Sequence, residues 1–198
     1  VTGARTKVLG TSTYLYTVSF YDNKGRVIQT QSTNNAGGVN ITTTQYNWAG
    51  QPLVAVERQQ VITGGSQENI VVTQFSYDNL SRLVKTEKKN GNSVLNTIIG
   101  LSAEDYIVTS ELEYDKLGQL KKKKLAPAYN SNEGLETLDY DYNVRGWMLG
   151  MNRSYLSNTP SDHYFGFELG YDKLTNNSGR NFLAGSNSGE FNGNINGM

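Results

Sequence analysis

The chain has 198 residues, a formal net charge of zero, no cysteine and a single histidine. Zero net charge gives no global field that would attract nucleic acid or an anionic membrane, and the absence of cysteine excludes disulfides and thiolate chemistry. The sequence contains 13 tyrosines and 21 glycines but only 3 prolines, and its aromatic and β-branched residues favour strands over helices. No apolar run reaches the length of about 18 residues that a membrane-spanning helix needs.

A short phrase recurs about every 30 residues, which is typical of a repeat architecture. Its first copy is Tyr21-Asp22-Asn23-Lys24-Gly25, and later copies keep the tyrosine, then Asp or Asn, and usually the glycine. Asp or Asn at the first turn position can accept hydrogen bonds from backbone amides, and glycine at the fourth position adopts the left-handed conformation easily. Each phrase therefore predicts a strand, a tight turn and a second strand. The motif residues are Tyr21, Asp22, Gly25, Tyr46, Asn47, Gly50, Tyr77, Asp78, Tyr114, Asp115, Gly118, Tyr142, Asn143, Gly146, Tyr171 and Asp172.

The predicted elements are antiparallel hairpins, and the fold class is therefore all-β. In the first strand Tyr14, Tyr16, Val18 and Phe20 alternate with polar or smaller residues, which predicts one buried face. Ser81 stands where the third turn would have glycine, so we expect a different or strained turn there. Repeats are expected near residues 14–31, 41–58, 70–89, 107–125, 135–152, 162–174 and 191–198.

Between the hairpins, residues 32–40 are predicted to be a loop by composition, and residues 59–69 a loop or a flexible extension of the second hairpin. Asn90-Gly91-Asn92 predicts an additional hairpin turn that returns the chain through residues 94–99. Residues 102–105 could form one helical turn, and residues 164–171 are predicted to be the last long strand.

The residues offer little for catalysis. His163 is the only histidine, so a Ser-His-Asp triad would have to use it. Asp162 precedes it, but adjacent strand residues point to opposite faces. We therefore expect no enzymatic activity, no cofactor and no metal site in this chain. Calcium is not expected because each turn offers one carboxylate, whereas calcium takes six to eight oxygen ligands.

Two further features have alternative interpretations. The lysines at positions 121–124 could bind a polyanion, but on a strand they alternate faces, so a solvated sheet edge that resists aggregation is the preferred interpretation. Trp48 and Trp147 lie inside predicted turns and could form sugar-stacking platforms. The fixed position of the tyrosines beside the turns instead favours a packed ladder between repeats.

The phrase Tyr-Asp-x-x-Gly followed by Arg or Gln resembles the YD repeat of the bacterial Rhs protein family. The resemblance extends from about Tyr14 to Met198, and residues 25–32, 138–147 and 191–195 resemble the branch exported by the type IX route. It implies a long β-sheet ribbon that spirals into a hollow cage around a C-terminal, often toxic, polypeptide. The segment with which many family members release the toxin by aspartyl autoproteolysis is not recognisable here.

The expected function is accordingly structural: residues 1–198 would be a YD-repeat segment of a much larger secreted or cell-surface protein used in intercellular competition. Its partners would be the rest of its own polypeptide, including the enclosed cargo, and the translocon of an outer-membrane secretion machine. No nucleic-acid binding and no direct membrane insertion are expected. The alternative is a repeat module that adheres to cell-surface glycan.

Overall fold

The computed structural model describes residues 2–95, 106–157, 163–176, 179–182 and 192–198. These residues form an all-β fold of twelve strands, and every strand pairing is antiparallel. The predicted fold class is confirmed at this level. Among the described residues no helix is long and apolar enough to cross a membrane. The chain divides into two compact units, unit 1 (residues 1–108) and unit 2 (residues 109–198).

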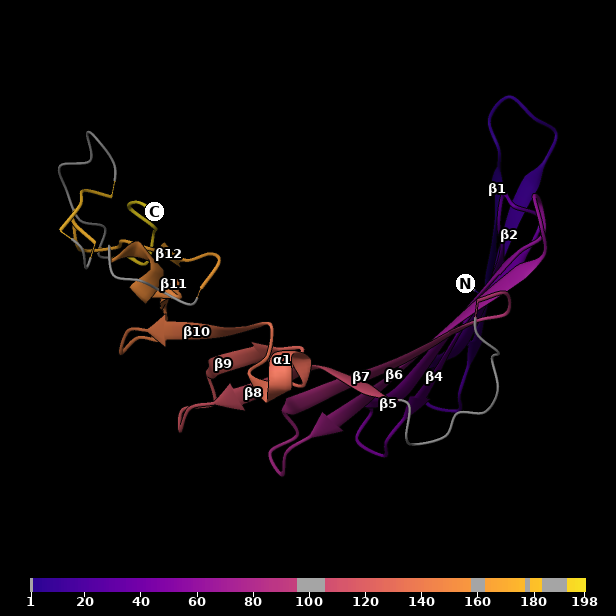
Figure 1. The fold of residues 1–198 in the computed structure, drawn as a ribbon. Coiled ribbons are helices and arrows are strands. Elements are labelled where there is room, and N and C mark those ends of the chain that lie inside the picture. The colour runs from indigo at the N-terminus through magenta and orange to yellow at the C-terminus, as the bar shows by residue number, and fades with distance from the viewer. Residues whose placement is uncertain (1, 96–105, 158–162, 177–178, 183–191) are drawn as a thin grey trace. The chain divides into compact units, whose positions relative to one another are not determined.

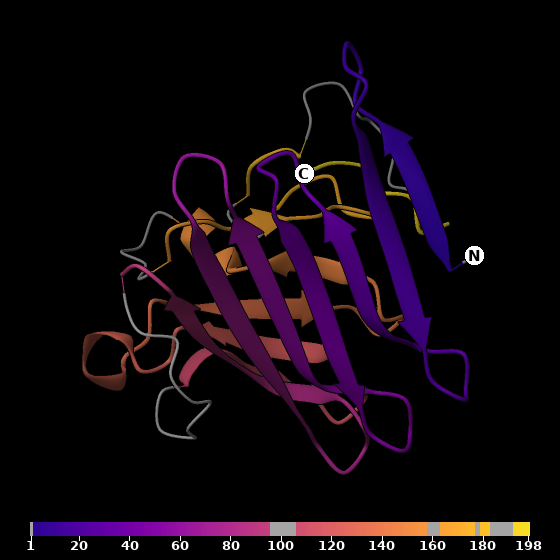
Figure 2. The same cartoon turned by 90° about the vertical axis from the view of Figure 1, so that its right-hand side faces the viewer.

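Unit 1 is an open antiparallel sheet in which each strand pairs with the next along the chain. Figure 2 shows these strands running side by side, joined by short loops at alternate ends. Local hairpin connections need little loop-closure entropy, which favours this order. The strands are β1 (Gly3–Lys7), β2 (Tyr14–Tyr21), β3 (Val27–Thr33), β4 (Val39–Tyr46), β5 (Pro52–Val61), β6 (Gln67–Tyr77) and β7 (Leu83–Asn92).

The interior of unit 1 is small. Val72 on β6 is fully buried and pairs with Val56 on β5, and Thr73 is the other buried β6 residue. On β2 the expected burial is wrong, because Tyr16, Val18 and Phe20 are more exposed than the intervening Thr17 and Ser19. The two faces of β2 do alternate in exposure, but the aromatic face is the one left partly open to solvent.

Unit 2 also follows sequence order, with β9 between β8 and β10, and β11 between β10 and β12. Its last two strands are short, with four and two residues. Figure 1 shows the four-residue segment α1 after β9, and its Asn130 and Ser131 have left-handed φ angles of 50° and 57°. The elements are β8 (Ile107–Tyr114, whose first two residues belong to unit 1), β9 (Leu120–Leu125), α1 (Tyr129–Asn132), β10 (Glu136–Tyr142), β11 (Met148–Met151), the 3-10 helix η2 (Arg153–Leu156) and β12 (Phe167–Glu168).

The interior of unit 2 mixes aromatic and polar side chains. Tyr171 and Phe182 are buried, and the Trp147 ring lies 5.3 Å from that of Tyr171, measured between centroids. Asn152 and Glu168 are buried as well. Buried polar groups are tolerated when they are hydrogen-bonded, and the partners of these two residues lie within unit 2.

Several predicted boundaries are corrected by the structure. Residues 90–92 do not turn; they are the extended end of β7 and pair with residues 69–71 of β6. The long β6 strand supplies enough backbone partners to keep this Asn-Gly pair in the ladder. The loops predicted at residues 32–40 and 59–69 are shorter than expected and are confined to residues 34–38 and 62–66, because the flanking residues belong to β3, β4, β5 and β6. The expected strand and helical turn at residues 96–99 and 102–105 lie outside the described residues.

The lysines at positions 121–124 do not form a sheet edge. Their strand, β9, is paired on both sides, so it is an interior strand. Lys122 lies opposite Glu113 on β8 and Asp139 on β10, and its Nζ is 3.3 Å from the Asp139 carboxylate. Opposite charges on both neighbouring strands make Lys122 acceptable there. The expected strand at residues 164–171 is also wrong, because only Phe167–Glu168 forms a ladder.

Candidate functional site: a ladder of linked turns

The repeated phrase folds into a turn closed by its own Asp or Asn side chain. In the first copy the Asp22 carboxylate accepts hydrogen bonds from the backbone N–H groups of Lys24 (2.8 Å) and Arg26 (2.9 Å). The backbone closes the same loop, because Gly25 N–H donates to the Asp22 carbonyl and Asp22 N–H to the Arg26 carbonyl. Gly25 has φ +78°, the left-handed conformation expected of it. The predicted turn chemistry is confirmed.

The same arrangement occurs at all four remaining complete copies of the phrase. The Asp or Asn oxygen accepts from the backbone N–H group four residues later at distances of 2.8 to 3.0 Å. The fourth residue adopts positive φ each time. These copies begin at Asn47, Asp78, Asp115 and Asn143.

The third copy keeps this geometry without glycine. Ser81 has φ +65°, and its N–H donates to the Asp78 carbonyl at 2.9 Å, as glycine does elsewhere. Of the two expected outcomes, the strained turn is therefore the one observed. A non-glycine residue in this region costs roughly 1 kcal/mol.

Two further turns of this type were missed in the sequence. Asn34 accepts from the N–H groups of Ala36 and Gly38, and Asn176 accepts from that of Arg180. Glycine at the fourth position was the available signal, but neither copy is preceded by tyrosine. By contrast, Tyr171-Asp172 begins like a copy of the phrase, yet the turn nearby begins at Asn176 instead.

The tyrosines connect successive repeats through their hydroxyl groups. Tyr46 donates to the carbonyl of Val27 (3.0 Å), Tyr77 to that of Pro52 (2.8 Å) and Tyr171 to that of Met148 (2.8 Å). Each acceptor is the second residue after the glycine of the preceding turn. A ladder of stacked tyrosines was predicted; in these three cases the link between repeats is a hydroxyl-to-backbone hydrogen bond.

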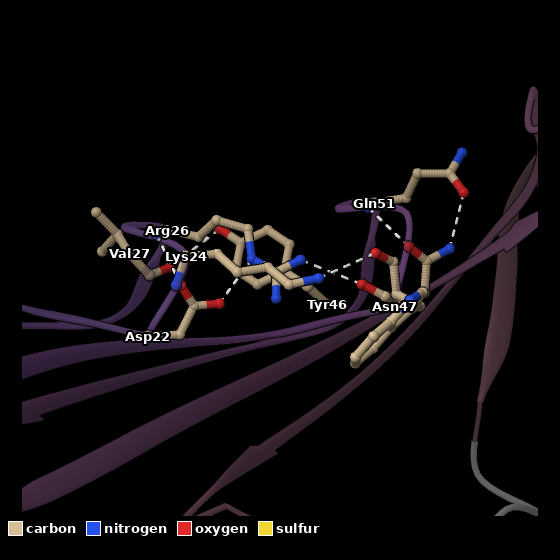
Figure 3. A network of polar contacts seen from close by, with 8 residues as sticks. Asp22, Lys24, Arg26, Val27, Tyr46, Asn47 and Gln51 are labelled. Atoms are coloured by element: carbon tan, nitrogen blue, oxygen red, sulfur yellow. Dashed lines mark hydrogen bonds and ion pairs between the residues drawn. The ribbon is translucent and has the colours of Figure 1, made fainter.

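Side chains of one turn also reach the next turn within unit 1. Arg26 Nη1 donates to the Asn47 carbonyl (3.1 Å), and its guanidinium lies 4.8 Å from the centroid of the Tyr46 ring. Lys24 Nζ lies 4.1 Å from the centroid of the Trp48 ring. Further along, Gln51 Nε2 donates to the Ser81 carbonyl at 2.7 Å. Figure 3 shows the contacts between the first two turns.

The turn carboxylates are electrostatically stabilised in the charged form. The pKa of Asp22 is lowered by the hydrogen bond from the Arg26 backbone N–H, helped by the Arg26 side chain and the Lys24 N–H, while desolvation opposes the shift. The pKa of Asp78 is lowered in the same way by Arg82 and Leu80. Burial raises the pKa values of Tyr77, Tyr140 and Tyr142 above the ordinary value for a phenol.

The remaining candidate residues do not assemble a reactive site in the described part of the chain. His163 Nδ1 lies 3.7 Å from Glu136 and its Nε2 lies 3.9 Å from Asp139; Asp162 lies outside the described residues. No group of three or more His, Asp and Glu residues placed to hold a metal ion occurs among the residues that the structure describes. The two tryptophans differ: Trp48 is almost fully exposed, whereas Trp147 packs between Arg145 and Tyr171.

Unit 2 contains a cavity of about 290 Å³ beside Trp147 and Tyr171. Its charged lining is partly neutralised internally, because Arg153 Nη2 donates to Glu168 at 2.6 Å. The other Arg153 terminal nitrogen lies 3.6 Å from Asp141. The cavity therefore presents a mixed surface without a convergent set of reactive groups.

The sequence matches no protein-family model and no curated protein.

Proposed function

We propose that the chain is a structural wall segment of a secreted or cell-surface YD-repeat protein, with the strands continuing into a spiralling ribbon. The ribbon would form a hollow cage around a C-terminal toxic cargo used in intercellular competition. The whole polypeptide would be exported by an outer-membrane secretion machine. These residues would build the wall, and any toxin or autoproteolytic activity would belong to other parts of the polypeptide.

The observation that supports this proposal is the link between successive turns. In unit 1 the first turn reaches the second through Arg26, and the second reaches the third through Gln51. The tyrosine hydroxyls link the repeats in the opposite direction, because Tyr46 and Tyr77 donate hydrogen bonds to the first residue of the second strand in the preceding hairpin. The donor is the fifth residue counted from the Asp or Asn in both turns, Arg26 or Gln51, and repeats that reach their neighbours from one position suit a wall that grows by repetition.

The open sheet of unit 1 supports the same interpretation. The five residues of β1 are all exposed, and within unit 1 this strand pairs on one side, with β2. An unprotected strand edge promotes association with other strands. We therefore expect the 198-residue chain produced alone to aggregate or fold poorly, and a monomer that melts cooperatively would contradict the proposal.

The direct test is electron microscopy of the intact protein combined with limited proteolysis. A closed shell with internal density, and a C-terminal fragment that resists protease until the shell is opened, would support the proposal. A solid or extended particle with a freely digested C-terminus would overturn it. The secretion step is tested separately: disabling the type IX translocon should retain the protein inside the cell.

Glycan binding has weaker support. A sugar site needs polar groups beside an aromatic ring, but the Asn47 carboxamide next to Trp48 is bonded to Gln51 within the turn. Trp147 is packed inside unit 2. A glycan array on the intact protein would reveal binding if the remaining surface of Trp48 were sufficient.

A further inference from the structure

The turns of the repeated phrase display large apolar side chains at their tips. Four of the five complete copies carry one at the second or third turn position, and none of these side chains is covered. Turn tips usually carry small polar residues. Single exposed apolar side chains are ordinary in proteins, but their recurrence at the two central positions of a repeated turn needs a physical reason. The exposed fractions are 90% for Trp48, 73% for Leu80, 81% for Leu117 and 101% for Val144.

Within unit 1 these tips form a row. The hydrogen bonds from Arg26 to Asn47 and from Gln51 to Ser81 place the three turns side by side. Figure 2 shows their loops together at one end of the strands. Successive turns at one end are two strands apart, so the tips are spaced about 10 Å from one another. The row presents Lys24, Trp48 and Leu80.

The carboxylates of this row are less accessible at the surface than the lysine ammonium group. Asp22 and Asp78 are engaged inside their turns by backbone N–H groups and by the arginines Arg26 and Arg82. Lys24, in contrast, is exposed at the tip, with its ammonium group beside the Trp48 ring. The acidic groups thus point into the turns, and the outer surface of the row is apolar and cationic.

We propose that this row of turn tips is a contact surface for an anionic lipid membrane. Tryptophan favours the membrane interface because its ring is apolar and its N–H is polar. Leu80 would add apolar area, and Lys24 would add attraction to anionic headgroups. The polar groups that a sugar would need are already bonded within the turns, and leucine tips offer a sugar nothing. Contact would be superficial, because these side chains extend only from turns.

Unit 2 independently repeats the composition of the row. Its two complete turns carry Lys116 beside Leu117 and Val144 beside Arg145. Each pair combines an exposed apolar side chain with a cation at adjacent turn positions. Exposed apolar and cationic side chains therefore occur at the central turn positions in both units.

The test is flotation of the intact protein with vesicles of phosphatidylcholine, with and without phosphatidylglycerol. The protein should bind the anionic vesicles, and Trp48→Ser combined with Leu80→Ser should weaken binding by at least about tenfold, because two apolar side chains are lost. Lys24→Gln should weaken binding to anionic vesicles alone, by about fivefold. The matched control is Leu9→Ser, because Leu9 is 92% exposed in the β1–β2 loop at the opposite end of the strands.

Fluorescence distinguishes contact by this row from contact elsewhere. Trp48 and Trp147 are the two tryptophans of the chain, so Trp48→Phe leaves Trp147 as the chain's own reporter. Anionic vesicles containing brominated lipid should quench and blue-shift the emission, and Trp48→Phe should remove that response. The proposal is overturned if no vesicle binds, if the double serine variant binds as well as the parent, or if Leu9→Ser weakens binding equally. Binding to a glycan or a protein that the same double variant abolishes, without vesicle binding, would also overturn it.

Discussion

The two units of the chain use the same repeat but are stabilised in different ways. Unit 1 has strands of up to 11 residues and a very small interior, and its turns are linked one to the next. Unit 2 has short strands and a 3-10 helix around buried polar side chains. Its Tyr171 keeps the hydroxyl link to the preceding repeat. The difference indicates that a regular repeat can depend on its turns, whereas an irregular one needs a specific interior.

The substitution with the largest expected effect on stability is at Asn152 in unit 2. Asn152 is 1% exposed, accepts from Asp139 N–H at 2.8 Å, and donates to the Glu136 carboxylate (3.1 Å) and the Phe165 carbonyl (2.9 Å). Removing these bonds leaves buried groups unpaired, so Asn152→Ala should lower the free energy of unfolding by about 3 kcal/mol. Denaturant unfolding of the intact protein measures this change.

Two control variants separate the loss of the Asn152 side chain from the strain of its backbone conformation and from the effect of an ordinary surface substitution. Asn152 has φ +47°, so Asn152→Gly removes the side chain but keeps a backbone conformation that glycine accepts, and it should cost about 1 kcal/mol less than Asn152→Ala. Asn23→Ala, at an exposed turn position of unit 1, should change stability by less than about 0.5 kcal/mol. If Asn152→Ala were as mild as Asn23→Ala, the polar interior would not be what stabilises unit 2.

The link between repeats is tested by removing one hydroxyl. Tyr77→Phe deletes the 2.8 Å bond to the Pro52 carbonyl and should cost about 1 kcal/mol. Tyr16→Phe is the control, because Tyr16 is an exposed tyrosine on the face of β2, and it should have no measurable effect. Thermal denaturation of the intact protein compares them. Equal melting temperatures for the two variants would mean that the hydroxyl links do not stabilise unit 1.

The strained turn of the third repeat should respond in the opposite direction. Ser81→Gly places glycine at φ +65° and should raise stability by about 1 kcal/mol. The matched reverse change is Gly25→Ser, which should lower stability by a similar amount, because Gly25 has φ +78° and open space around its Cα. Denaturant midpoints of both variants test the pair, and effects of the same sign would refute the explanation.

The turns were more predictable from the sequence than the strands between them. Asp22 and Gly25 determine a local conformation within five residues, so their roles follow from short-range chemistry. Asn90-Gly91 has the same local preference for a turn, but long-range pairing with β6 overrides it. The target of each tyrosine hydroxyl depends on strand register, which the sequence does not specify by itself. Asn152 follows β11, and its side-chain partners come from two separate segments of unit 2, β10 and Phe165, which no local pattern brings together.

The smallest expected effect is a pH dependence confined to the turns. The pKa values of Asp22 and Asp78 are lowered in the folded protein, so their ionised forms stabilise it above the ordinary value of 3.8, and this contribution is lost as the pH falls through the lowered folded values. Asp22→Asn combined with Asp78→Asn should flatten the decline of melting temperature below that pH. Asparagine already closes the turns at Asn47 and Asn143, so the variant should retain its fold at neutral pH. If the melting temperature of the variant declined at low pH as much as that of the parent, other carboxylates would control the decline. If the variant failed to fold at neutral pH, the turns would need the aspartate–arginine pairs as well as the backbone hydrogen bonds.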